Sequence, residues 1–131
     1  MQQKMQGKHL FEYAIIRVVP RVEREEFLNV GVIVYCASLK FLKCIFDVKA
    51  QRMKIFADEI EIDEILANLE AIEKICCGGE GGGPIGQLDM ASRFRWLTAT
   101  RSTVVQSSKV HPGFCEDAQA TLERLFRQMV S

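Results

Sequence analysis

The stretch FLNVGVIVYC, residues Phe27–Cys36, alternates between two kinds of side chain. Read as a strand, its even-numbered positions from 28 to 36 are all apolar, which predicts a face packed in the core. The odd-numbered positions mix apolar anchors with Asn29, Gly31 and Tyr35, so we expect the second face to combine packing with a polar site. Gly31 would let another backbone or a ligand approach closely.

Two apolar segments flank this stretch and predict further strands. Residues 10–19, LFEYAIIRVV, are rich in strand-forming side chains, and Pro20 ends the segment because it lacks an amide hydrogen. Arg17 stands in the otherwise apolar row of that strand. Residues 40–48, KFLKCIFDV, follow a short connection and predict an antiparallel hairpin. A short fourth strand is predicted at 103–107, paired with an outer edge of the first three.

The rest of the chain shows helical spacing. Apolar residues recur at helical intervals in 63–76, with Asp63 as the predicted N-cap and Gly78 just beyond the end. Residues 50–57, 88–97 and 117–130 predict further helices, and the His-Pro-Gly sequence within 110–115 predicts a turn. The expected fold class is therefore α+β, an antiparallel sheet of about four strands with helices packed mainly on one face.

Length and composition indicate one domain. The chain has 131 residues, enough to bury about two thirds of its unfolded surface and too few for two ordinary domains. Residues 1–8 have no apolar period, and we expect a disordered tail there. Residues 78–86, GGEGGGPIG, are expected to be a flexible loop without regular structure, either a lid or a linker.

Charge and cysteine usage narrow the function classes. Acidic and basic residues balance at 17 each, which argues against a nucleic-acid partner. The five cysteines show no disulfide framework, so we expect reduced thiols and a cytoplasmic location. No apolar run approaches the roughly 18 residues of a membrane span, and we expect no membrane association.

A basic segment holds the strongest group of candidate site residues, because no acid occurs from Met90 to Phe114. Arginine side chains there could hold a phosphate or carboxylate, or they could stack on Trp96 and pair with acids elsewhere in the chain. The candidate ligand-binding residues of this segment are Arg93, Arg95, Arg101, Ser102, Thr103 and His111.

A second group of candidates surrounds the first two predicted strands. If Arg17 and Asn29 face the same way on neighbouring strands, they form a polar patch on the sheet, together with Glu23 and Arg24 of the charged connection. The alternative is an internal salt-bridge network that ties this connection to the sheet.

No sequence motif indicates a cofactor or a metal. The glycine-rich segment lacks the Gly-Lys-Ser/Thr ending of a phosphate-binding loop. The cysteine and histidine spacings match no zinc pattern, and no paired carboxylates suggest hydrolysis. Catalytic residues are therefore not identified, although Cys115 and His111 lie close enough in sequence to meet across the predicted turn.

Three blocks of the chain resemble the bacterial domain-of-unknown-function family 3037. They are YAIIRVVPRVEREEFLNVGVIVYC (13–36), GGPIGQL (82–88) and RFRWLTATRSTVVQSSKVHPGF (93–114). The resemblance implies a small bacterial cytoplasmic protein and supplies no established activity, cofactor or catalytic residue. It also suggests a HipA-like kinase as a partner. One departure is Thr100, where the family pattern has a proline.

Two functions remain open from the sequence. The first is a non-enzymatic binding or adaptor module for a protein partner, such as the HipA-like kinase. The second is an enzyme or ligand-binding domain that acts on a phosphorylated small molecule or nucleotide through its arginines. A homo-oligomer formed through a free sheet edge is a third open question.

Overall fold

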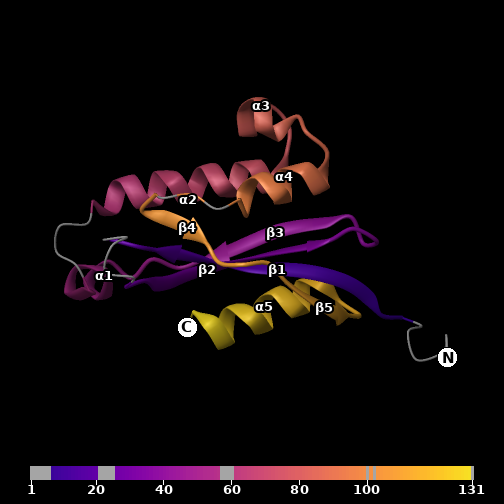
Figure 1. Cartoon of the computed structure of the whole chain (residues 1–131), viewed down its shortest axis with the longest axis horizontal. Helices are drawn as coiled ribbons and strands as arrows, with labels where there is room; N and C mark the ends of the chain where they lie inside the picture. Colours follow the sequence, from indigo (N-terminus) through magenta and orange to yellow (C-terminus); the bar gives the residue numbers. More distant parts are fainter. Residues whose placement is uncertain (1–6, 21–25, 57–60, 100, 102, 131) are drawn as a thin grey trace.

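Strands form where β-branched and aromatic residues are concentrated, and helices form where apolar residues recur every three or four positions. The computed structural model describes residues 7–20, 26–56, 61–99, 101 and 103–130. The elements are β1 His9–Val18, β2 Leu28–Cys36, β3 Phe41–Phe46, α1 Ala50–Phe56, α2 Ile62–Cys77, the 3-10 helix η3 Glu80–Gly82, α3 Gly83–Gly86, α4 Met90–Leu97, β4 Val105–Ser107, β5 His111–Cys115 and α5 Ala118–Met129. The α+β fold with an antiparallel sheet is confirmed (Figure 1).

The sheet has five strands because β1 accepts partners on both sides. The order is β3-β2-β1-β4, and β5 also pairs with β1, further towards its N-terminus. The turn predicted at 110–115 is wrong, since this segment is the strand β5. Pro112 lies opposite Glu12 of β1, and β5 pairs with no second strand of the described chain. Proline is tolerated in such an edge strand because its missing amide hydrogen can face away from the sheet.

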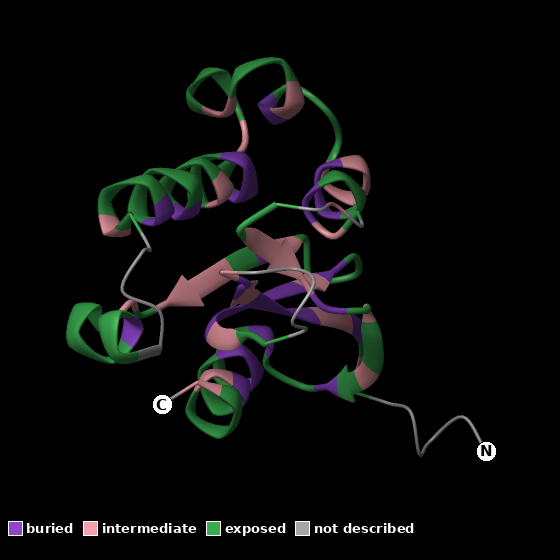
Figure 2. Cartoon of the chain, turned by 60° about the vertical axis from the view of Figure 1, so that its left-hand side comes forward, coloured by how far each residue is buried: buried purple, intermediate pink, exposed green. Residues whose placement is uncertain are grey.

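Helices cover both faces of the sheet. Residues of α1, α2 and α4 share one hydrophobic core with the sheet, and α5 forms a second core on the opposite face. Figures 1 and 2 show α2 and α4 on one side and α5 on the other, with the buried residues of each helix turned towards the strands. α2 and α4 thus cover one face and α5 covers the other, while α1 lies at one end of the sheet, where Met53 joins the first core. None of the described helices has the length and apolar character that crossing a membrane requires.

A β-bulge at Val30 exchanges the two faces of β2. Ile16 pairs with Gly31 while Arg17 pairs with Asn29, so Val30 is the extra residue. As a result Val30 joins the core under α2, whereas Val32 and the later even-numbered positions join the core under α5. The single all-apolar face predicted for 28–36 is therefore wrong, because one inserted residue reverses the side-chain alternation.

Gly31 sits where β2 and β3 come very close together. A Cβ atom at this position would lie 2.7 Å from the Ile45 carbonyl oxygen. The expected close approach of another backbone at Gly31 is confirmed, and that backbone belongs to β3.

The glycine-rich segment is folded. Residues 80–82 form η3 and 83–86 form α3, so the prediction of no regular structure there is wrong. Gly79 donates its N–H to the Gly86 carbonyl at 2.8 Å, and a Cβ atom on Gly86 would collide with the Gly79 oxygen. The glycines allow the chain to fold back on itself here.

The helix ends are fixed by local signals. The N-cap of α2 is Glu61, two residues before the predicted Asp63, and Gly78 ends the helix as predicted. Asp89 and Asp117 cap α4 and α5, each accepting a hydrogen bond from a backbone N–H three residues later.

Candidate functional site

Arg93 is built into the scaffold. Its guanidinium donates to the carbonyl oxygens of Ile75 (2.8 Å) and Cys76 (2.7 Å), and its Nε donates to Leu88 (3.1 Å). The first two carbonyls belong to the last turn of α2, where a cation also complements the helix dipole. Gly78 makes room for this contact, since a Cβ atom there would lie 2.9 Å from Arg93 Nη1. Arg93 therefore holds α4 against the C-terminal end of α2.

Trp96 and Arg101 form a stacked pair on the surface. The Arg101 guanidinium carbon lies 4.1 Å from the centroid of the Trp96 ring, and its Nη2 donates to the Trp96 carbonyl oxygen at 2.6 Å. The Trp96 side chain nevertheless stays 41% exposed. The predicted stacking of an arginine on this tryptophan is confirmed by these contacts. Of the acids predicted to pair with these arginines, Glu23 lies outside the described residues, and the acidic helix α2 forms no ion pair with Arg101 in the part of the chain that is described.

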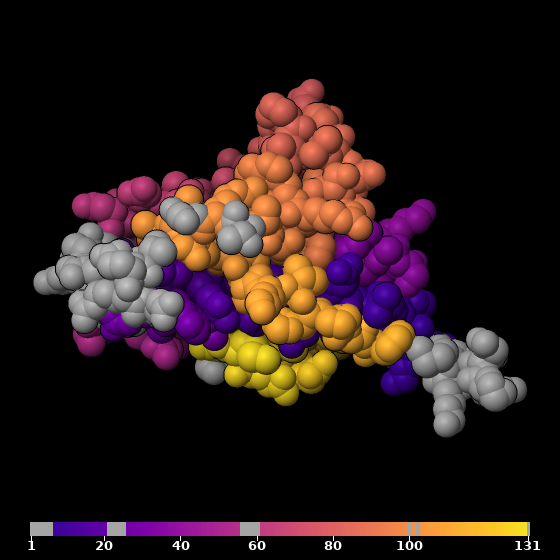
Figure 3. Space-filling view, in the orientation of Figure 1, coloured from indigo at the N-terminus to yellow at the C-terminus, as the bar shows by residue number. Residues whose placement is uncertain are grey.

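A groove opens beside this pair. Its volume is about 200 Å³, and it lies between Ile72 and Ile75 of α2, Trp96 of α4, and Arg101 and Val105 of the following segment. We call it the Trp96–Arg101 groove. A smaller hollow of about 60 Å³ shares Ile72, Trp96, Arg101 and Val105 and reaches the sheet. In Figure 3 the segment from α4 to β5 crosses the middle of one face, between α2 and α5.

Arg17 and Asn29 meet on the other face of the sheet. They are direct partners in the β1–β2 ladder, as the sequence suggested. The Arg17 guanidinium lies 4.1 Å from the Phe27 ring centroid, and Asn29 Nδ2 donates to the Met129 carbonyl of α5 at 3.1 Å. Arg17 Nε and Asn29 Oδ1 are buried atoms that have no hydrogen-bond partner within the described part of the chain. A donor and an acceptor thus lie near each other unused, beside the C-terminal end of α5.

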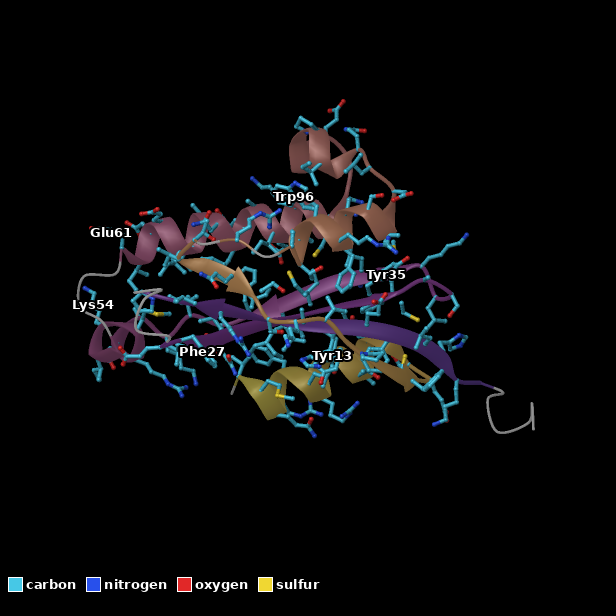
Figure 4. The ribbon with its side chains drawn as sticks, in the orientation of Figure 1. Tyr13, Phe27, Tyr35, Lys54, Glu61 and Trp96 are labelled. Carbon is cyan, nitrogen blue, oxygen red and sulfur yellow. The ribbon has the colours of Figure 1, made fainter. Side chains whose placement is uncertain are left out.

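The candidate residues do not form one site. Asn29, the ladder partner of Arg17, donates to α5, whereas Arg93 contacts α2 and Arg101 contacts α4. Figure 4 labels Phe27, the ring against Arg17, and Trp96, the ring against Arg101, on opposite sides of the sheet. Arg95 is exposed on α4, and His111 on β5 contacts the ring of Tyr13, with centroids 5.3 Å apart. Thr103 donates its hydroxyl to the Val105 carbonyl. Glu23, Arg24 and Ser102 lie outside the described residues.

The α2 wall of the groove carried no recognisable sequence signal. Asn68, Ile72 and Ile75 appear in the sequence only as positions of an amphipathic helix. Which side of α2 faces α4 depends on the Arg93 contact, which links residues 17 and 18 positions apart.

The thiols of Cys76 and Cys115 are poorly suited to nucleophilic chemistry. A hydrogen bond with the Cys44 thiol, together with burial, raises the pKa of Cys76. Burial, followed by the neighbouring Cys36, raises the pKa of Cys115. Both groups are therefore protonated at neutral pH, and a thiol is a far weaker nucleophile than a thiolate. No three histidine, cysteine or acidic side chains of the described residues are placed to hold a metal ion.

These features define a small α+β protein with an antiparallel five-stranded sheet, a groove beside half-exposed Trp96 on one face and a half-buried arginine-asparagine pair on the other. The family model described as "Protein of unknown function (DUF3037)" matches residues 13–130, and the chain belongs to that family. Searches of curated proteins and of solved structures found no match.

Proposed function

We propose that this protein is a non-enzymatic adaptor module that binds a protein partner through the Trp96–Arg101 groove. The observation that carries this proposal is the half-exposed Trp96 stacked under Arg101, beside an apolar groove of about 200 Å³. Tryptophan and arginine are the residues most enriched among those that dominate binding energy in protein interfaces. The rigid attachment of α4 to α2 through Arg93 supports a preformed surface.

The distribution of charged groups favours binding over catalysis. Arg17 and Arg101 lie on opposite faces, and Arg93 is engaged with carbonyl oxygens. An enzyme for a phosphorylated substrate would gather such groups around one reacting atom.

The partner we propose is a HipA-like kinase, and the setting we propose is the bacterial cytoplasm. The resemblance to family 3037 supports the kinase, and five free cysteines support a reducing compartment. Co-expression of the two proteins followed by affinity purification at physiological salt tests this pairing. We expect a stable complex, and its absence would remove the kinase from the proposal.

A pair of variants tests the binding surface. Trp96→Ala should weaken the complex by at least about tenfold, the loss typical of a central interface tryptophan. Ile55→Ala is the matched control, because Ile55 is an 88% exposed apolar residue on α1 outside the groove. Equal binding by both variants would show that the partner uses another surface.

A second candidate function rests on Arg17 and Asn29. Their unused buried donor and acceptor support an anion-binding site for a phosphorylated small molecule or nucleotide. A thermal-shift screen with nucleotides and phosphosugars tests it: a stabilising compound should lose its effect in Arg17→Gln and keep it in Arg124→Gln, an exposed arginine of α5. A screen without any stabilising compound would argue against this site.

A further inference from the structure

We infer that the segment seated in the Trp96–Arg101 groove is a short acidic-apolar stretch of the partner protein, with one large apolar anchor residue next to a carboxylate. This inference rests on the proposed function and names the chemistry of the bound segment. It follows from the free donors of Arg101, the size of the groove and the charged residues that flank it.

Arg101 is prepared for a carboxylate. A guanidinium has five N–H donors, and among the described residues Arg101 uses one, from Nη2 to the Trp96 carbonyl. Stacking on Trp96 fixes the plane of the guanidinium and shields one side of it from water. A fixed, partly desolvated guanidinium forms two parallel hydrogen bonds to a carboxylate at little further entropic cost.

The groove has room for one anchor side chain. Its volume is about 200 Å³, and an engineered apolar cavity of roughly 150 Å³ holds a benzene molecule. A phenylalanine or leucine side chain therefore fits between Ile72, Ile75 and Val105, and the adjoining hollow of about 60 Å³ leaves space for a further methyl group. Because these walls are apolar, the anchor must be apolar as well.

Among the described residues, Arg101 is the one charged residue that lines the groove, and further charges lie on neighbouring turns of the elements that form its walls. The segment from α4 to β5 has no acid, and exposed Arg95 lies on α4 near Trp96. On α2 helical spacing places exposed Glu64 on the same side as Asn68, one turn earlier. A bound segment with its acid towards Arg101 therefore matches the basic wall, and a basic residue at its other end would match Glu64.

The experiment uses Trp96 as its own reporter, since it is the single tryptophan of the chain. The probes are twelve-residue glycine-serine peptides in which aspartate precedes phenylalanine by one, two or three residues. We expect at least one to change Trp96 emission in a saturable way, with a Kd below about 1 mM. Replacement of its aspartate by asparagine, or of its phenylalanine by alanine, should weaken binding by at least about tenfold.

A charge exchange tests the contact with Arg101 directly. Arg101→Glu should lose the aspartate peptide and gain the matching lysine peptide, while Arg124→Glu, on the opposite face, should leave both unchanged. Melting temperatures of all variants confirm that they fold. N-acetyl-phenylalanine should bind more weakly than the peptide, because it lacks the chain that spans the groove.

The outcomes separate this inference from the adaptor function. If the kinase co-purifies but no peptide binds, or if Arg101→Glu leaves the complex unchanged, the inference about the groove is overturned and the adaptor function stands. If a peptide binds with the expected charge preference while the kinase does not co-purify, the inference stands and the kinase is the wrong partner. Equal binding of N-acetyl-phenylalanine would overturn the protein segment in favour of a small molecule.

Discussion

Arginine side chains in this protein contact carbonyl oxygens and aromatic rings where acids were expected. Arg93 donates to three carbonyls, and Arg101 stacks on Trp96 and donates to its carbonyl. Both belong to a segment without acids, so the nearest acceptors are main-chain oxygens at helix ends. Two arginines of one basic segment thus have different roles: Arg93 stabilises the fold, and Arg101 lies on the surface. The sequence alone does not distinguish them.

Arg93→Ala should lower the free energy of unfolding by about 2–4 kcal/mol, because it leaves buried carbonyls of the last turn of α2 without donors. Urea denaturation followed by circular dichroism measures the change. Arg93→Lys, which keeps the charge but not the geometry of three donors, should fall between wild type and alanine. A lysine variant as stable as wild type would show that charge alone suffices.

Gly31→Ala should destabilise the protein by about 1–3 kcal/mol, since the new methyl group must displace the β3 backbone near Ile45. Gly81→Ala is the control, because a Cβ atom on Gly81 meets nothing within 4 Å. It should change stability by less than about 0.5 kcal/mol. The same denaturation measurement applies, and similar losses for both variants would contradict the close packing at Gly31.

At the scale of elements, periodicity predicts most of this fold. The strands around residues 10–19, 27–36 and 40–48, and the helices of 63–76 and 117–130, all occur within a few residues of their expected bounds. The bulge at Val30 escapes prediction because the even-numbered positions are apolar both before and after it, so the pattern does not show where the alternation breaks. β5 escapes because Pro112 and Gly113 read as a turn unless the edge position of the strand is known.

The candidate site is less predictable than the fold. The condition set for a polar patch, that Arg17 and Asn29 lie side by side on neighbouring strands, is met in the β1–β2 ladder. The Trp96–Arg101 groove depends on how α4 docks on α2, a tertiary contact that local spacing does not encode. Residues paired on neighbouring strands are therefore easier to predict from sequence than residues brought together by helix packing.

The N-terminal end of α4 depends on Asp89. Its side chain accepts a hydrogen bond from the Ser92 N–H at 2.8 Å, and the bonds to Ser92 hold the pKa of Asp89 below its ordinary value of 3.8. Because the folded pKa is depressed, the stabilisation is present above pH 3.8 and is lost as pH falls through the folded pKa. Asp89→Ala should therefore lower the melting temperature at neutral pH, and the difference from wild type should shrink in acid.

Asp89→Asn provides the control for this pH dependence. Asparagine caps a helix about as well as aspartate but does not titrate. The difference in melting temperature between the asparagine and alanine variants should stay constant with pH. If the difference in melting temperature between wild type and Asp89→Ala also stays constant with pH, the carboxylate charge plays no part in the cap.

Across the whole molecule, one sheet separates two hydrophobic cores. The core under α2 includes Ile33 and Ile65, and the core under α5 includes Val32 and Leu122. Neighbouring residues of β2 thus point into different cores. The two candidate sites lie on different faces. A variant in the Trp96–Arg101 groove should therefore leave binding at the Arg17–Asn29 pair unchanged.

The reactivity of the cysteines can be used to test the packing on both faces of the sheet. Cys77 is exposed at the end of α2, whereas Cys36, Cys76 and Cys115 are buried. A thiol-specific reagent should therefore label Cys77 rapidly in the folded protein and the three buried cysteines only after denaturation. Cys77→Ser should remove the rapid phase, as mass spectrometry of the labelled protein would show. Rapid labelling of Cys115 would contradict the packing of β5 against α5.

The pairing of β1 with β4 and β5 determines when the protein can finish folding. Ile15 N–H donates to Ser108 Oγ across a separation of 93 residues. During synthesis, one side of the first strand must therefore wait, with its main-chain groups unpaired, until residues 105–115 have left the ribosome. Contacts so distant in sequence slow folding, and an interrupted translation product that ends before residue 105 would expose an open strand ready to aggregate.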